Sequence, residues 1–340
     1  MKPILTIISL TLLAACSVGP DYVKPTATTP KEYKELPPWK VAHPSDNLDR
    51  GSWWRIYNDN RLNELEQQVA VSNQTLKSAE AQFRQARALV QASRSGYFPQ
   101  VSAGATVDRS RSNSSKGATT STNYLLNLDA SWELDVWGRV RRSVESSQAG
   151  AQASSADLES LRLSLQAELA VDYFQLRTID AQKKLLDETV SSFQKYLDLT
   201  RNRYTAGVVS QADVLQAETQ LKNTQAQAID LGVQRAQLEH AIALLIGKAP
   251  AELSLSLSPL DAVPPVTPIG LPSELLERRP DIAAAERRVA AANAQIGVAK
   301  AAYFPAITLS STAGFAASSF SSWLSWPNRV WALGSILAQT

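Results

Sequence analysis

The sequence has few of the residues from which most catalytic and metal sites are built. Its 340 residues include one cysteine, one methionine and two histidines. A single cysteine excludes a disulfide within the chain, and His43 and His240 without cysteine partners argue against a zinc site. No nucleophile elbow, HExxH motif, P-loop or glycine-rich dinucleotide turn is present. We therefore expect no enzyme, no cofactor and no bound metal.

Charge and long apolar runs are also scarce. Lys, Arg, Asp and Glu make up 19% of the residues, below the usual share of about 25%. The formal net charge is only +2 and no basic block stands out, so nothing indicates nucleic-acid binding. The apolar run over residues 4–15 is too short to span a bilayer.

That short run is typical of a signal peptide. Lys2 precedes it, and it ends in Leu-Ala-Ala followed by Cys16. This ending resembles the bacterial lipoprotein box, which implies that residues 1–15 are removed and that Cys16 is acylated. Ser17, in place of Asp, implies retention in the outer membrane. The alternative is an ordinary secretory signal with a buried cysteine. Acyl chains anchor a protein but do not span the membrane.

Prolines and a sequence repeat divide the rest of the chain. Proline clusters predict an anchor and extended tether at 16–58 and a linker at 250–272. The motif that ends in Tyr97-Phe98-Pro99 returns, in register, as Tyr303-Phe304-Pro305. This self-similarity predicts two structural repeats, residues 59–249 and residues 273–340. By the same register the second repeat is expected to lack about 110 residues, including most of its second strand.

Long helices are predicted in the first repeat. Residues 138–205 contain no proline and would form a rod on the order of 100 Å at 1.5 Å per residue. Apolar residues there and in 211–247 recur at steps of four and three, which favours coiled-coil packing. We expect an antiparallel helical hairpin with a tight tip at 206–210.

Three segments alternate between apolar and polar residues, which is typical of membrane β-barrel strands. Two of them predict a β-hairpin at 100–137, and the third covers residues 307–315. In the second segment the polar side carries Asp129, Glu133 and Asp135. These carboxylates cost little free energy if that side faces water, but in a sandwich core each would need a partner. A barrel is therefore favoured over a soluble sandwich, and two strands per repeat require several copies of the chain to close it.

Two further features fit that prediction. The polar segment 109–122 suits an extracellular loop between the first two strands. Trp323, Trp326 and Trp331 suit an interfacial aromatic belt, although buried packing accounts for them equally well.

Several motifs follow one another in a specific order along nearly the whole chain. They are Cys16 with Gly19-Pro20-Asp21-Tyr22, Trp132-Glu133-Leu134-Asp135-Val136-Trp137-Gly138-Arg139, Ala167-Glu168-Leu169-Ala170, Gly207 to Ser210 with Asp213, Gln234 to His240, Glu277 to Ile282 and Ala299 to Pro305. Each is weak alone. As an ordered set they resemble the outer-membrane factor family of TolC-like efflux channels, and most closely its NodT-type lipoprotein branch.

The resemblance implies a mainly α fold with membrane β structure. Three chains would share a twelve-stranded outer-membrane barrel and a periplasmic α-barrel of long coiled-coil helices. The homotrimer would be a passive conduit of a tripartite RND-type efflux system or a type I export system. Its partners would be a periplasmic adaptor, an inner-membrane pump and outer-membrane lipid, and its cargo small toxic molecules.

The hairpin tip is where the family contacts its adaptor. Carried over residue by residue, the resemblance assigns this contact to Arg203, Tyr204, Gly207, Val208, Ser210 and Asp213. The alternative is that Gly207, Ser210 and Asp213 only end one helix and cap the next. Both roles are compatible.

Two other functions compete with a working channel. A lipid-anchored periplasmic adaptor also combines a lipoprotein signal with a coiled-coil hairpin, but it needs lipoyl-like β segments beside the hairpin. The other is a non-functional relic of the channel, because the shortened second repeat leads us to expect that the 340-residue chain does not conduct by itself.

Overall fold

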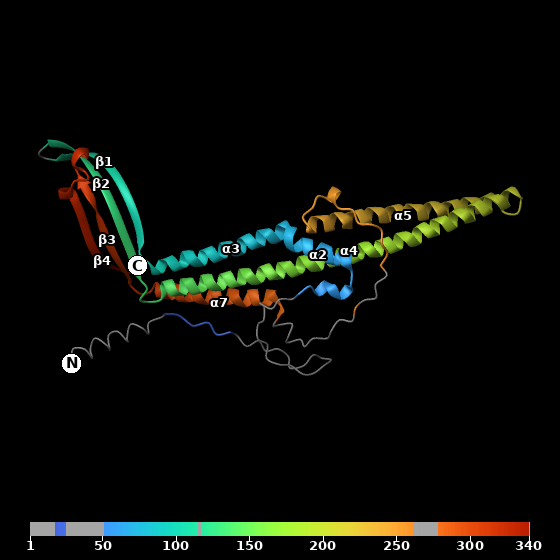
Figure 1. Ribbon diagram of the computed structural model, residues 1–340, viewed down its shortest axis with the longest axis horizontal. Coiled ribbons are helices and arrows are strands. Elements are labelled where there is room, and N and C mark those ends of the chain that lie inside the picture. The colour runs from blue at the N-terminus through green and yellow to red at the C-terminus, as the bar shows by residue number, and fades with distance from the viewer. Residues whose placement is uncertain (1–17, 25–50, 115–116, 261–264, 266–277, 340) are drawn as a thin grey trace. The chain divides into compact units, whose positions relative to one another are not determined.

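The structure is a computed structural model that describes residues 18–24, 51–114, 117–260, 265 and 278–339 (Figure 1). Cys16 and the expected signal peptide lie outside the described residues. The chain divides into two compact units, each described here by itself. The first comprises Met1–Pro30, Gln82–Ala156 and Asp281–Thr340, and the second comprises Lys31–Ala81 and Asp157–Pro280. The expected division into repeats and linker remains a prediction.

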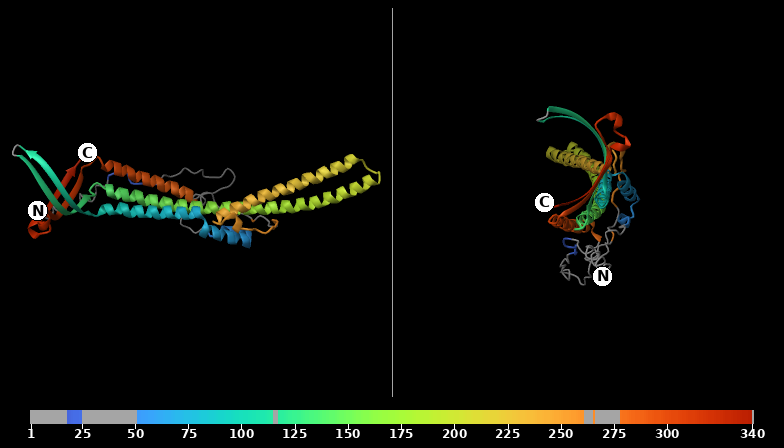
Figure 2. Two further views of the ribbon diagram at one scale, coloured as in Figure 1. Left: turned by 90° about the horizontal axis from the view of Figure 1, so that it is seen from above. Right: turned by 90° about the vertical axis from the view of Figure 1, so that its left-hand side faces the viewer.

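The first unit contains a four-stranded antiparallel sheet in the order β1-β2-β3-β4. The right-hand view of Figure 2 shows that the sheet curves into an arc. The predicted alternating segments coincide with three of the four strands, except that the second was expected to continue past Leu134. The strands are β1 (Gln100–Ser114), β2 (Gly117–Leu134), β3 (Ala306–Ala317) and β4 (Arg329–Ala338).

Two expectations about these strands were wrong. Residues 109–122 were expected to form a loop, but β1 and β2 stay paired from Gln100 opposite Ser131 to Ser114 opposite Gly117. Most of the fourth strand was expected to be missing. Instead, β4 pairs with β3 from Ala306 opposite Ala338 to Phe315 opposite Arg329. In both places backbone hydrogen bonds continue the ladder, because pairing depends on main-chain groups and not on side-chain alternation.

Helices of the first unit pack through small side chains. They are the later part of α3 (Gln74–Arg94), the start of α4 (Arg139–Thr205), and α7 (Pro280–Ala301). Ala156 of α4 lies against Ala283 and Ala284 of α7 in a buried cluster. Ser93 and Ser147 share a 2.7 Å hydroxyl hydrogen bond between α3 and α4. Small residues allow this close approach of backbones, which explains the alanine-rich and serine-rich composition.

The second unit contains the helical hairpin. The later part of α4 and all of α5 (Gln211–Leu245) run side by side in opposite directions (Figures 1 and 2). Leu197, Ala217 and Leu221 form their buried seam, with Val190, Phe193 and Val214 packed against it. With 67 residues, α4 is about 100 Å long. Among the described residues, no helix combines the length and apolarity needed to cross a bilayer.

The base of the hairpin is held by α2 (Asn60–Ser72). The Asp59 carboxylate caps α2 by accepting from the backbone N–H groups of Arg61 and Leu62. The Tyr173 hydroxyl of α4 donates to the same carboxylate at 2.7 Å. At the other end Asn73 Nδ2 donates to the Leu245 carbonyl at 2.8 Å. Burial, followed by this bond to Asp59, raises the pKa of Tyr173 to about 12.

Candidate functional site

The hairpin tip is built by a helix stop followed at once by a helix start. Gly207 adopts φ +75°, a left-handed conformation that glycine reaches without a Cβ penalty. The N–H groups of Gly207 and Val208 donate back to the carbonyls of Tyr204 and Arg203, both at 2.9 Å. These bonds satisfy carbonyls that the end of α4 leaves without helical partners.

Ser210 then caps α5. Its hydroxyl accepts from the Asp213 N–H, and the Asp213 carboxylate accepts from the Ser210 N–H at 2.8 Å. The predicted capping box is therefore confirmed. Hydrogen bonds from the Ser210 hydroxyl and then its backbone N–H hold the pKa of Asp213 below its usual value. Asp213 stays ionised at the positive end of the α5 dipole.

The six predicted tip residues lie between Arg203, near the end of α4, and Asp213, near the start of α5, and all are exposed to solvent. Val208 has 66% of its surface exposed, and Tyr204 has 46%. The apolar side chains of Tyr196, Leu199 and Leu215 are also more than half exposed nearby, and the sequence analysis did not select them. Their exposure could have been found from the same heptad pattern, because they fall outside the apolar seam. The tip therefore presents apolar side chains on a turn that backbone hydrogen bonds and the capping box close.

A buried charge cluster lower on the hairpin was also missed. Asp180 is fully buried on α4, where its Oδ1 accepts from Arg235 Nε at 2.7 Å. Its Oδ2 accepts from Arg177 Nη1 at 3.2 Å and from the Ser258 N–H at 3.0 Å. Glu239 accepts from Arg235 and from the Leu255 N–H. The cluster clamps the segment after α5 onto both helices.

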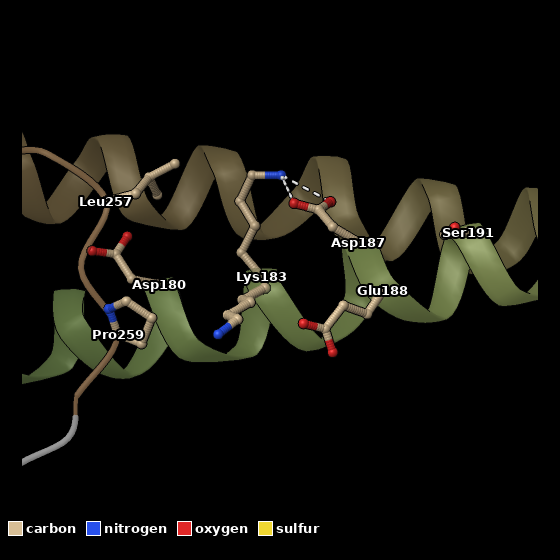
Figure 3. Close-up of a pocket in the computed structure, with 8 residues that line it drawn as sticks. Asp180, Lys183, Asp187, Glu188, Ser191, Leu257 and Pro259 are labelled. Atoms are coloured by element: carbon tan, nitrogen blue, oxygen red, sulfur yellow. Dashed lines mark hydrogen bonds and ion pairs between the residues drawn. The ribbon is translucent and has the colours of Figure 1, made fainter.

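A cavity lined by charged residues adjoins this cluster. It has a volume of about 460 Å³, and α4 lines one side while Leu257 and Pro259 line the other (Figure 3). Lys183 pairs with Asp187 at 3.0 Å. Asp180 accepts hydrogen bonds on both carboxylate oxygens, from Arg177, Arg235 and the Ser258 N–H. Within the described residues, no group of His, Cys, Asp and Glu could hold a metal ion.

The sheet has two chemically distinct faces. Directly opposite residues in an antiparallel pair lie on the same face. Val107 faces Tyr124, Leu128 faces Ala313, and Ala313 faces Trp331, so apolar side chains from all four strands share one face. On the other face the Thr312 hydroxyl donates to Asp129 at 2.6 Å. The structure thus gives the sheet one apolar surface and one polar surface.

The acidic residues at the base of the sheet do not all belong to it. Glu133 pairs with Arg139 through bonds of 2.6 and 2.7 Å. Asp135 was expected on the polar side of a strand, but β2 ends at Leu134. Its carboxylate instead accepts from the N–H groups of Val140 and Arg141. Asp135 therefore serves the first turn of α4, where donors lack helical partners.

The segment after Cys16 is held against the first unit. The Val18 N–H donates to the Trp137 carbonyl at 3.2 Å. Asp21 pairs with the buried Arg142 at 2.6 Å, and the Tyr22 hydroxyl donates to Glu286 at 3.0 Å. Burial and then the Glu286 carboxylate raise the pKa of Tyr22. The Gly-Pro-Asp-Tyr motif is thus a docking segment at the junction of β2 and α4.

Comparison with known proteins agrees with this architecture. The model of the family described as "Outer membrane efflux protein" matches residues 65–248 and 271–333. The probable efflux pump outer membrane protein TtgC of Pseudomonas putida is 34% identical over 312 residues, covering 89% of this chain and 64% of TtgC. The cation efflux system protein CusC of Escherichia coli is 28% identical, covering 94% of this chain and 69% of CusC.

Solved structures show the same fold. The outer-membrane channel OprN superposes with a TM-score of 0.81 at 37% identity, covering 95% of this chain and 73% of OprN. The open state of the Neisseria gonorrhoeae MtrE outer membrane channel gives a TM-score of 0.78 at 28% identity, covering 96% of this chain and 72% of MtrE. The chain spans 64% of the length of the curated relatives first matched.

These matches confirm the predicted fold of long helices with a strand sheet, and they confirm the outer membrane as the location. The family model covers most of the chain, in the same order as the motifs quoted from the sequence. The chain belongs to the outer membrane efflux protein family.

Proposed function

We propose that the chain is the outer-membrane channel component of a tripartite RND-type efflux system or a type I export system. It would be a passive conduit, with no catalysis of its own, that carries small toxic molecules from the periplasm or an inner-membrane pump to the exterior. The observation that carries the proposal is the curved sheet with one apolar face and one acid-bearing face. Such a sheet suits lipid on one side and water on the other.

Assembly into a homotrimer follows from the edges of the sheet. Within the described strands, β1 and β4 each have a partner on one side only. An open edge leaves backbone groups unsatisfied in lipid, so further copies have to pair with both edges. Three copies of four strands make the twelve-stranded barrel that the resemblance implies. A periplasmic adaptor would not place such a sheet in lipid, so it would not need further copies to close the sheet.

Oligomeric state and conductance together test this proposal. The purified chain in detergent should show a trimer by native mass spectrometry, and a monomer would overturn the shared barrel. Conductance steps in planar bilayers would support a working channel and contradict the expectation of a non-conducting chain. A trimer without conductance would favour the relic.

The exposed tip supports a contact with a periplasmic adaptor. Val208 and Tyr204 present apolar surface on a turn that Gly207 and the Ser210–Asp213 capping box hold in place. A photo-crosslinking residue at position 208 should yield an adduct in living cells that mass spectrometry identifies as an adaptor. The same probe at Ile229, which is 72% exposed on α5, is the matched control. Equal labelling at both positions would contradict a specific tip contact.

We propose that Cys16 is lipidated, as the lipoprotein-like signal that precedes it implies. Val18 is tied to Trp137, three residues after β2 ends, and two residues of chain reach at most about 7 Å. The acyl chains would therefore enter the membrane beside the base of the sheet. Labelled palmitate should be incorporated into the chain but not into Cys16→Ser. Labelling of Cys16→Ser would place the lipid elsewhere.

A further inference from the structure

The register of the sheet sorts its charged residues by sign. Arg109 pairs with Thr122 and Arg111 with Thr120, two and four residues beyond Val107 on the same face. Arg329 faces Phe315, which lies on that face too. All three arginines of the four strands therefore share the apolar face. Asp108, Asp129 and Glu133, the only acidic residues of these strands, fall on the opposite face by the same alternation.

The three arginines also lie at one end of the apolar surface. Along β1 the apolar face reads Val101, Ala103, Ala105 and Val107 before it reaches Arg109 and Arg111. Arg329 is the first residue of β4 and pairs near the end of β3. This is the end at which the strands turn into their hairpins, away from the ends joined to α3, α4 and α7 (Figure 1). We call these residues the arginine rim.

Aromatic rings mark the same level of the sheet. Tyr124, which pairs with Val107, contacts the rings of Phe320 and Trp323 at centroid distances of 5.9 and 5.6 Å. The Arg329 guanidinium lies 3.8 Å from the centroid of Trp326. Tyrosine and tryptophan gather where the hydrocarbon of a membrane meets its headgroups. Arg109, two residues beyond Val107, lies just past this belt at headgroup height, and Arg329 lies against the belt itself.

Two of the rim residues have unused binding capacity. Arg109 and Arg111 are exposed, and neither makes an ion pair with any residue that the structure describes. Residues two apart in a strand lie roughly 7 Å apart on one face, so a single headgroup can reach both. A guanidinium binds phosphate through two parallel hydrogen bonds. All five of its N–H groups are donors, and it has no acceptor atom.

We propose that the arginine rim binds the phosphate groups of a phosphorylated lipid in the leaflet that the hairpin ends of the sheet reach. The inference rests on the proposed function, because it requires the apolar face to lie in lipid. It goes further by naming the headgroup chemistry and the residues that recognise it. Charge complementarity and continuity with the acyl-contacting surface support this occupant. The acidic residues on the opposite face would repel the same phosphates.

The test distinguishes the effect of the position of the arginines on the sheet from the effect of their number. Arg109→Gln/Arg111→Gln removes two charges. A face-swapped variant, Arg109→Ser/Ser110→Arg/Arg111→Ser/Ser112→Arg, keeps composition and net charge but moves both guanidinium groups to the other face. Each protein is mixed with phosphatidylcholine vesicles that carry either phosphatidate or diacylglycerol of the same chain length. Partitioning is measured by flotation.

The unchanged chain should prefer the phosphatidate vesicles, and the two arginines should contribute roughly 30-fold to that preference. Both variants should lose this contribution. A face-swapped variant that keeps the full preference would show that net charge alone acts, and would overturn the rim. Full competition by inorganic phosphate at equal concentration would likewise overturn assignment to a lipid.

A second readout separates this proposal from the function on which it rests. Phosphatidylcholine with brominated acyl chains should quench the fluorescence of Trp331, which is 75% exposed on the apolar face. A Trp331→Phe chain identifies its share of the signal. Quenching without phosphate preference would overturn the rim alone. Absence of Trp331 quenching would overturn the membrane position of the sheet, and the rim with it.

Discussion

Glu66 gives the sharpest prediction of a pH-dependent property. It lies on α2 in a stripe with Leu62, Leu65 and Val69, and all four side chains are fully buried. This spacing is that of an apolar helix face, in which a carboxylate is out of place. Neither of its carboxylate oxygens has a hydrogen-bond partner among the described residues. Burial alone raises the pKa of Glu66 to about 8, from an ordinary value of 4.5.

The sign of the effect follows from proton binding. Between pH 4.5 and about 8 the folded chain holds a proton on Glu66 that the unfolded chain has released. The free energy of unfolding therefore falls as pH rises through this window, and the contribution is lost above the folded pKa. A pKa difference of one corresponds to about 1.4 kcal/mol, so the rise from 4.5 to about 8 gives a full loss on the order of 5 kcal/mol.

Two substitutions isolate this contribution. Glu66→Gln keeps the shape but cannot ionise, so the pH dependence that Glu66 causes should vanish. Glu66→Leu should in addition raise stability above pH 8, because it removes an unpartnered polar group. Glu64→Gln is the control, since Glu64 is 60% exposed and pairs with Arg61 at 2.7 Å. It should leave the slope almost unchanged.

Urea unfolding followed by circular dichroism at several pH values measures these differences. The original chain and Glu66→Gln should diverge steadily as pH rises from 4.5 towards 8. Parallel profiles for the two proteins would show that the carboxylate is hydrated or paired when folded, and the reasoning from burial would be wrong. A slope removed equally by Glu64→Gln would lead to the same conclusion.

Further predictions concern the hairpin. Gly207→Val should lower the free energy of unfolding by about 1–2 kcal/mol, because Val cannot readily adopt φ +75°. Gly232→Ala should raise it by about 0.5 kcal/mol, since an added Cβ in this helix meets no atom within 4 Å. Asp180→Ala should cost about 3 kcal/mol, because it leaves the buried Arg177 without its ion pair and leaves Arg235 with Glu239 alone. Asp187→Ala, which removes an exposed pair, should cost less than about 1 kcal/mol. Thermal or urea unfolding of each variant checks these values, and equal losses for the two aspartates would contradict the buried clamp.

Local signals were enough to predict much of the hairpin. The heptad pattern predicted that apolar residues of 138–205 and 211–247 would pack against one another, and Leu197, Ala217 and Leu221 form that buried seam. The capping box needed only Ser210 and Asp213, which are three residues apart. Both predictions succeed because the interactions repeat over one or two helical turns.

The charge clamp could not be predicted in this way. Asp180 meets Arg235 and Ser258, which lie 55 and 78 residues further along the chain. Each residue by itself looks like part of a solvated helix face. Only the tertiary packing of the segment after α5 brings them together. The burial of Glu66 could not be predicted for a related reason. The sequence shows a carboxylate among apolar residues of one helix face, but not which other segments cover that face.

The arginine rim shows why the sheet was predicted only in part. Alternation between apolar and polar residues reports which face is buried in lipid, and it stops after Val107. The ladder between β1 and β2 does not stop there, because it depends on backbone groups that serine, threonine and asparagine pair as well as valine does. Residues beyond the apolar band were therefore assigned to a loop, although they keep the strand's two-faced geometry. Arg109 and Arg111 acquire a common direction only from this continued register. The backbone hydrogen bonds of β1 and β2 continue beyond Val107, where the apolar residues of this face end. It is this continued pairing that places Arg109 and Arg111 together at headgroup height.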